Sequence, residues 1–132
     1  MGNNFSIQKK LIAEALQRLD HPTAAEIHQE VAKTYAGISL GTVYRNINHM
    51  LEAGTAGRLV LPGEPDRFES HNQPHAHILC SGCDRLRDFE PLPDETLRAI
   101  SQRLTEQIEF YVNTYSLVFF GMCTECRKKT NP

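Results

Sequence analysis

All four cysteines of the chain fall in two Cys-x-x-Cys pairs, Cys80/Cys83 and Cys123/Cys126. A Cys-x-x-Cys turn presents two thiolates to one ion, and two such turns complete the tetrahedral four-thiolate shell that zinc prefers. A shell of this kind leaves no open coordination position, so it indicates a structural rather than a catalytic zinc. The alternatives are a redox-active pair or two disulfides, and both fit a single thiol pair better than two matched pairs.

Two histidines, His75 and His77, stand just before the first cysteine pair. They are two residues apart, so on a β-strand both imidazoles leave the same face. A four-cysteine shell does not need them, which leaves them for a second, separate metal site. The alternative is that they are exposed histidines of an ordinary strand.

The composition is that of a globular protein with one domain or two small ones: 132 residues, 40% hydrophobic and 23% charged. No apolar run approaches the ~20 residues of a membrane span, and residues 1–10 lack the apolar core of a signal peptide. Reduced, metal-binding cysteines without an export signal predict a cytoplasmic protein that does not associate with membranes. The net charge of -2 gives no global case for nucleic-acid binding, which must rest on a local motif.

Helical periodicity predicts three helices in the first half of the chain, over about residues 6–19, 23–36 and 39–53. Ser6 is expected as the N-cap of the first helix, and Thr23 forms a capping box with Glu26 at the second. Gly37 and Gly54 are expected to end the second and third helices. The apolar stripes that would face a common core are Leu11, Ile12, Ala15, Leu16 and Leu19, then Ile27, Val31 and Tyr35, then Leu40, Val43, Ile47, Met50 and Leu51.

The third of these helices has an outer face unlike that of an ordinary solvated helix. Until Glu52 it lacks acids and offers side chains that hydrogen-bond bases and phosphates. These are Thr42, Arg45, Asn46, Asn48 and His49. Two short helices joined by a tight turn, with such a face on the second, are typical of helix-turn-helix domains. A plain three-helix core would explain the apolar positions equally well.

Two short strands at residues 58–61 and 67–69 flank a turn rich in Pro and Gly, which predicts a β-hairpin. Helices followed by a hairpin are the element order of a winged helix, in which Arg58 and Arg67 would contact phosphates. Alternatively, both are solvated arginines. Acidic residues slightly outnumber Lys and Arg up to residue 70, so DNA affinity would require a second copy of the domain or a conformational gate.

The composition changes at residues 71–74, which predicts two domains, 1–70 and 71–132. The second is expected to be small and αβ, with strands over residues 75–79, 85–89 and 115–120. A helix that starts at Asp94 and Glu95 is expected to bury four apolar side chains. These are Leu97, Ile100, Leu104 and Ile108. The last strand is apolar on both faces, which predicts burial against a partner chain, most simply in a twofold dimer.

The motifs HPTAAEIHQEV, GISLGTVYRNINHMLEAG, RFES, HAHILCSGC and CTEC, in this order, resemble the ferric uptake regulator family over about residues 5–129. The resemblance implies an α+β protein with an N-terminal winged helix-turn-helix domain and a small C-terminal dimerisation domain that holds the four-cysteine zinc. It implies a homodimeric, metal-dependent repressor of double-stranded operator DNA that controls metal homeostasis or oxidative-stress genes, not an enzyme. The expected DNA-binding residues are Thr42, Tyr44, Arg45, Asn48 and Arg58.

The resemblance also implies a regulatory ion at the junction of the two domains. Its ligands would be His21, Glu69, His75, His77 and Asp88. Three imidazoles and two carboxylates suit Fe2+ or Mn2+, and Zn2+ in vitro, whereas all-thiolate sets select zinc. An ion that bridged the two domains would set the angle between the winged helices.

Three features depart from the family pattern. Peroxide sensors of the family usually have Asp at the position of Glu69, which argues against strong peroxide sensing. An extra metal site of some members would need other residues at Pro74, Ala76 and Tyr115, so that site is not expected although Glu95 fits. The chain opens only a few residues before its first helix, so the family's additional N-terminal helix, which often adds DNA contacts, is expected to be missing or very short.

The leading hypothesis is therefore an iron- or manganese-activated repressor. Close alternatives are a peroxide sensor that acts by metal-catalysed histidine oxidation and a zinc-responsive repressor, although that branch usually brings a cysteine to its sensing site. A mononuclear metal hydrolase built on His75, His77 and a carboxylate is a remote alternative that no HExxH pattern supports. A zinc-knuckle module that binds RNA or protein would not need His21 or Glu69, and would bind one ion per chain where the sensor binds two.

Overall fold

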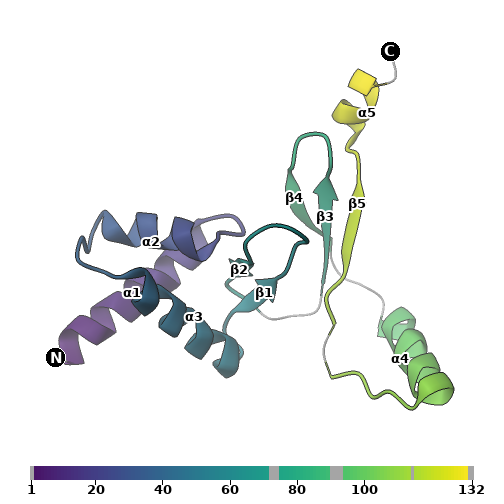
Figure 1. The fold of residues 1–132 in the computed structure, drawn as a ribbon, viewed down its shortest axis with the longest axis horizontal. Helices are drawn as coiled ribbons and strands as arrows, with labels where there is room; N and C mark the ends of the chain where they lie inside the picture. Colours follow the sequence, from purple (N-terminus) through teal and green to yellow (C-terminus); the bar gives the residue numbers. More distant parts are fainter. Residues whose placement is uncertain (1, 72–74, 90–93, 114, 131–132) are drawn as a thin grey trace. The chain divides into compact units, whose positions relative to one another are not determined.

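A computed structural model describes residues 2–71, 75–89, 94–113 and 115–130 and divides the chain into two compact units, Met1–Gln73 and Pro74–Pro132. The first unit contains α1 (Gly2–Arg18), α2 (Ala24–Ala32), α3 (Leu40–Ala53), β1 (Gly57–Leu59) and β2 (Arg67–Glu69) (Figure 1). The second contains β3 (Ala76–Cys80), β4 (Leu86–Phe89), α4 (Asp94–Ile108), β5 (Val118–Gly121) and α5 (Thr124–Thr130). The α+β architecture expected from the sequence is confirmed.

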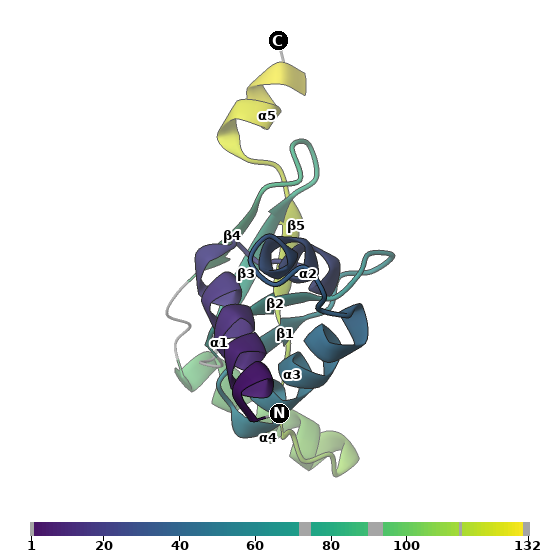
Figure 2. The same cartoon turned by 90° about the vertical axis from the view of Figure 1, so that its left-hand side faces the viewer.

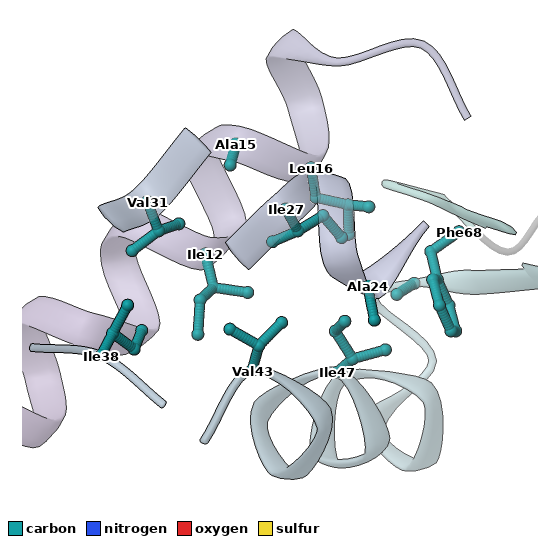
Figure 3. Packing of buried hydrophobic residues seen from close by; sticks show 11 residues of the cluster. Ile12, Ala15, Leu16, Ala24, Ile27, Val31, Ile38, Val43, Ile47 and Phe68 are labelled. Carbon is teal, nitrogen blue, oxygen red and sulfur yellow. The ribbon is translucent and has the colours of Figure 1, made fainter. Parts of the chain in front are cut away.

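The hydrophobic core of the first unit lies between its three helices. Ile12 from α1, Ile27 from α2 and Ile47 from α3 are completely buried and point into one cluster, which Phe68 from β2 joins (Figure 3). Figure 2 shows α2 nearly end-on, between α1 and α3. Each such side chain stabilises the fold by about 1.5–3 kcal/mol. The core therefore fixes both α3 and the hairpin within the first unit.

The expected caps of α2 and α3 are confirmed. The Thr23 hydroxyl accepts a hydrogen bond from the Glu26 N–H at 3.1 Å, and the Ser39 hydroxyl accepts one from the Thr42 N–H at 3.1 Å. Gly54, with φ of 76°, ends α3 in the left-handed conformation. These caps satisfy helix-terminal groups that would otherwise lack partners, which is why α3 has the bounds that the sequence predicted.

Four expectations about the helices are wrong. α1 begins before Ser6, which lies inside the helix, and α2 ends before Gly37. Leu40, in the first turn of α3, is exposed rather than part of the core. Asn46 is buried, because the helix turns it inward and its side-chain amide donates to the Thr42 carbonyl at 2.9 Å. Asn46 therefore does not belong to the outer face of α3.

β3 is the central strand of the three-stranded sheet in the second unit. β4 pairs with it antiparallel and β5 pairs with it parallel (Figure 1). The register places His77 opposite Asp88 across β3 and β4, and Cys80 opposite Gly121 across β3 and β5. The sheet therefore positions both groups of candidate metal ligands in this unit.

Much apolar surface of α4 and β5 stays exposed in the single chain. Leu97 and Leu104 are half-buried, but Ile100 and Ile108 are 54% and 65% exposed, so the expectation that α4 buries all four is wrong for one copy alone. β5 is shorter than expected, and its Phe120 is 60% exposed. No helix among the described residues is long and apolar enough to cross a membrane.

Candidate metal centres and nucleic-acid interface

The four cysteine sulfurs of the second unit lie within 4.8 Å of one another. One pair is carried by the turn between β3 and β4, and the other by the chain from the end of β5 into α5. The Ser81 N–H donates to the Gly121 carbonyl at 2.7 Å, and the Cys123 N–H donates to the Cys80 Sγ at 3.3 Å. The parallel pairing of β3 with β5 therefore brings the two turns together.

Glycine is required inside the first Cys-x-x-Cys turn. A Cβ at Gly82 would lie 2.8 Å from the Cys126 Cβ and 2.9 Å from its Sγ, which is closer than real Cβ contacts. Gly82 therefore makes room for the second thiol pair. The cysteine spacing alone did not reveal this role.

Backbone N–H groups and neighbouring thiols shift the pKa values of Cys80 and Cys126 in opposite directions. The Cys123 N–H, which donates to the Cys80 sulfur, lowers the pKa of Cys80 to about 6. The neighbouring thiols, Cys123 first and then Cys80, raise the pKa of Cys126 to about 12. Four sulfurs this close cannot all be thiolates unless a cation offsets their charge. Zinc would do so, because sulfurs bound to it tetrahedrally at ~2.3 Å lie ~3.8 Å apart, so the cluster fits a structural zinc.

A second group of donors in the same unit is formed by His75, His77 and Asp88. The Nε2 atoms of the two histidines are 3.0 Å apart, and Asp88 Oδ1 lies 3.5 Å from His75 Nε2 and 3.3 Å from His77 Nε2. Ligands bound to one ion at ~2.1 Å are ~3.0–3.4 Å apart. The three donors therefore fit a divalent ion. Both histidines are buried, so the alternative of exposed strand histidines is wrong.

His21, in the first unit, is held in an uncommon backbone conformation. Its φ of 47° lies in the left-handed region, which non-glycine residues adopt at an energetic cost. β2 fixes this conformation, because Arg67 donates to the His21 carbonyl at 3.1 Å and the Phe68 N–H donates to the Pro22 carbonyl at 2.9 Å. Asp20 Oδ1 lies 2.6 Å from His21 Nδ1. When Nδ1–H donates a hydrogen bond to this carboxylate, the Nε2 lone pair is left available for a metal.

Glu69, at the end of β2, is a buried carboxylate between two imidazoles. Its Oε1 lies 3.9 Å from His21 Nε2, and its Oε2 lies 3.3 Å from His71 Nε2. Burial of a carboxylate is costly unless a positive charge accompanies it. Either a protonated imidazole or a metal ion would supply that charge, so this group also fits a cation.

The sequence analysis did not single out Asp20 or His71 as site residues. Asp20 directly precedes His21, and His71 follows Glu69 by two residues, the spacing that places side chains on one face of an extended chain. Of the five expected regulatory ligands, the structure brings together His21 and Glu69 within the first unit. It brings together the other three within the second unit.

The expected nucleic-acid interface lies on α3 and β1. Tyr44, Arg45 and Asn48 are exposed, and half-buried Thr42 accepts a hydrogen bond from the Arg45 guanidinium at 3.0 Å. Arg58 of β1 donates to Asn48 Oδ1 at 3.5 Å, which links the hairpin to the same surface of α3. Four of the five expected DNA-binding residues are therefore exposed, and Thr42 is half-buried beside Arg45.

The model of the ferric uptake regulator family matches residues 1–120. The chain is 29% identical to the peroxide-responsive repressor PerR of Staphylococcus epidermidis over 111 aligned residues. This alignment covers 84% of this chain and 72% of that protein. Among solved structures, it is similar to the Campylobacter jejuni peroxide stress regulator, with a TM-score of 0.71, 27% identity, and coverage of 93% and 91% of the two chains. The Vibrio cholerae ferric uptake regulator matches with a TM-score of 0.62, 26% identity, and coverage of 88% of each chain. The chain therefore belongs to the ferric uptake regulator family, whose members are metal-binding, DNA-binding transcriptional repressors rather than enzymes.

Proposed function

We propose that this repressor acts as a homodimer and that Fe2+ or Mn2+ activates it for binding to double-stranded operator DNA. The observation that carries the proposal is the convergence of His75, His77 and Asp88, whose donor atoms lie 3.0–3.5 Å apart. These distances are close to the ~3.0–3.4 Å that separates ligands bound to a single ion at ~2.1 Å. The donors are nitrogen and oxygen atoms, and they are distinct from the four cysteines that suit a structural zinc.

The regulatory ion would take ligands from both units, with His21 and Glu69 joining His75, His77 and Asp88. Three donors do not complete the coordination of Fe2+ or Mn2+, which take up to six ligands in octahedral sites. An ion that binds residues of both units favours the arrangement in which they meet. Such an ion raises DNA affinity only to the extent that it binds this arrangement more tightly than the others. The ion would supply positive charge, and the side chains would hold it in place.

Fe2+ and Mn2+ are favoured over a zinc signal because no cysteine is left for the regulatory site. Imidazole and carboxylate ligands accept several divalent ions, and cellular supply helps to select among them. All four cysteines of the chain belong to the separate cluster, so none remains for a thiolate-containing zinc-sensing site. The structural site would hold Zn2+, and the regulatory site would also bind Zn2+ in vitro.

The homodimer is supported by the apolar surface of the second unit. Tyr111, Phe119 and Phe120 are largely exposed, as are Ile100 and Ile108 of α4. Exposed apolar surface of this extent marks interaction sites, and twofold homodimers are the commonest assembly. Two copies would present two α3 helices to a roughly palindromic operator. Two DNA-binding units in one dimer would also compensate for the weak DNA affinity expected of a single unit without net positive charge.

Operator binding should depend on the regulatory metal. The zinc-loaded protein is first used to select a DNA fragment from a random-sequence pool in the presence of Mn2+. Binding of that fragment, followed by fluorescence anisotropy, should strengthen at least tenfold with Mn2+ or anaerobic Fe2+ and return to the basal level when a chelator removes the added ion. Equal affinity with and without added metal would contradict the proposal.

A peroxide-sensing function is the second candidate, because peroxide regulators are among the relatives at 27–29% identity. Glu69 argues against it, since peroxide sensors of the family usually have Asp there. Brief peroxide treatment of the Fe2+ form should therefore leave the masses of the peptides that contain His21 and His75 unchanged. The Mn2+ form serves as the control. A rapid gain of one oxygen on either histidine in the Fe2+ form would instead establish peroxide sensing.

Arg45 is expected to contribute directly to DNA binding, because its guanidinium is exposed on α3 and steadied by Thr42. Arg45→Ala should weaken operator binding by about 1–3 kcal/mol if the side chain reads a base edge, or reduce the salt dependence if it contacts only phosphate. Lys33→Ala, which removes an exposed cation beside Glu30 on another helix, should change neither. Affinity and salt dependence that stay at wild-type values would show that Arg45 is merely solvated.

A further inference from the structure

We propose that His71 is a sixth side-chain ligand of the regulatory ion. The inference rests on the proposed function and deepens it. The five ligands expected from the resemblance are His21, Glu69, His75, His77 and Asp88. Five monodentate ligands leave one position open on an octahedral ion. His71 would close that position with a fourth imidazole.

The contact between His71 and Glu69 carries the proposal. His71 Nε2 lies 3.3 Å from Glu69 Oε2, while His21 Nε2 lies on the other carboxylate oxygen, 3.9 Å from Oε1. The first distance falls in the ~3.0–3.4 Å range between ligands that share an ion at ~2.1 Å. The first unit therefore offers three donors, two imidazoles with a carboxylate between them. This matches the two imidazoles and one carboxylate that the second unit offers.

The backbone of the first unit holds His71 in this place. Gly57 of β1 pairs with Glu69 of β2, and a Cβ at Gly57 would lie 2.6 Å from the His71 carbonyl oxygen. Only glycine permits this approach between the backbones of Gly57 and His71, so the chain after β2 continues directly beside β1. Glu69 and His71 are two residues apart in this extended chain, which sends both side chains to the same face. The imidazole is thus directed at the carboxylate by the backbone.

Glu69 and His71 differ in how deeply their side chains are buried, and this difference is compatible with metal binding. The Glu69 side chain is 9% exposed and the His71 side chain 39% exposed. The carboxylate is thus buried, while the imidazole beside it stays partly accessible to solvent and to an incoming ion. A sixth ligand would also leave no open position on the ion for an exogenous molecule. This agrees with the expectation, based on Glu69, that peroxide chemistry is weak.

The decisive measurement is the visible spectrum of Co2+ bound at the regulatory site. The full-length protein is loaded with one zinc per chain and then titrated with Co2+, and the absence of thiolate-to-cobalt bands confirms that the cysteine cluster keeps its zinc. His71→Leu preserves bulk and removes the donor. We expect its Co2+ affinity to fall tenfold or more and its ligand-field absorption to rise severalfold, because five-coordinate Co2+ absorbs more strongly than six-coordinate Co2+.

His49→Ala removes an exposed histidine of α3 and is the matched control, expected to retain the wild-type spectrum. Thermal unfolding checks that His71→Leu keeps the fold. A His71→Leu spectrum identical to that of the wild type would overturn the proposal, even with weaker affinity, since His71 would then only orient Glu69 from outside the shell. The proposed function fails separately, if zinc-loaded wild-type protein binds no second ion or if His77→Ala binds it equally well.

Discussion

Replacing Cys83 with serine is expected to remove the structural zinc, unfold much of the second unit and abolish the dimer. Zinc binding to a four-thiolate site contributes on the order of 10 kcal/mol that is also folding free energy. The second unit, Pro74–Pro132, is short, and the hydrophobic core of a unit of this size gives only marginal stability. A zinc held by all four cysteines would therefore add a strong link between the β3–β4 turn and the chain after β5.

The measurements are zinc stoichiometry, circular dichroism and sedimentation. Cys126→Ser should behave like Cys83→Ser, because either substitution leaves three thiols. Ser81→Ala is the matched control, since it changes the same turn without removing a sulfur and costs only a hydrogen bond to the Gly121 carbonyl. A zinc-free Cys83→Ser protein that remained a well-folded dimer would show that the four thiolates do not hold one zinc.

Gly82→Ala tests how zinc binding depends on the geometry of the four-cysteine cluster while the number of sulfur ligands stays the same. It keeps all four thiols, yet its Cβ would meet the Cys126 side chain at 2.8–2.9 Å. Such an overlap forces the second pair away from the first and should make zinc easier to remove with a chelator. The effect should be weaker than that of Cys83→Ser, because no ligand is lost.

The parts of the fold that the sequence predicted well are those set by local chemistry. The Thr23 and Ser39 caps depend on a hydroxyl that accepts a nearby N–H, and Gly54 depends on a left-handed backbone. The cysteine pairs likewise encode a local turn that presents two sulfurs. Each of these signals lies within four residues, so it could be recognised before any tertiary structure was known.

The parts that the sequence did not predict depend on neighbours that are distant in the chain. Asn46 reads as a polar outer-face residue, but its amide satisfies the Thr42 carbonyl and is buried by the core. Ile100 and Ile108 have core periodicity, yet in the described part of one copy both stay more than half exposed. The periodicity reports that a side chain will be buried, but not whether the same chain or a partner buries it.

In the candidate regulatory site, too, local signals were readable from the sequence and contacts between distant residues were not. His75 and His77 stood out as a pair because two residues on one strand share a face. Asp88 could be assigned only by resemblance, because its place opposite His77 is a matter of strand register. The left-handed conformation of His21 and the contact between His71 and Glu69 arise from the packing of β2 within the first unit. The two-residue spacing of Glu69 and His71 is a signal for their contact, but no local pattern in the sequence marks the backbone conformation of His21.

His77→Ala is expected to abolish metal-stimulated DNA binding while leaving the zinc-loaded dimer intact. His77 is central to its group, because its Nε2 lies 3.0 Å from His75 Nε2 and 3.3 Å from Asp88 Oδ1. Its loss leaves an incomplete set of donors in the second unit, so the ion no longer favours the DNA-binding arrangement. Metal content should fall from two ions per chain to one, and operator affinity should no longer respond to Mn2+ or Fe2+.

Arg87→Ala is the control, because it removes the charged side chain next to Asp88 on β4, which points to the opposite face of the sheet. Two further results should accompany the loss in His77→Ala. In the wild type, DNA should tighten metal binding by the same factor by which metal tightens DNA binding, since the coupling belongs to the whole cycle. Activation should also weaken as pH falls, because protons compete with the ion for the imidazole nitrogens. If His77→Ala kept both the second ion and the metal response, the regulatory ion would have to lie elsewhere in the protein.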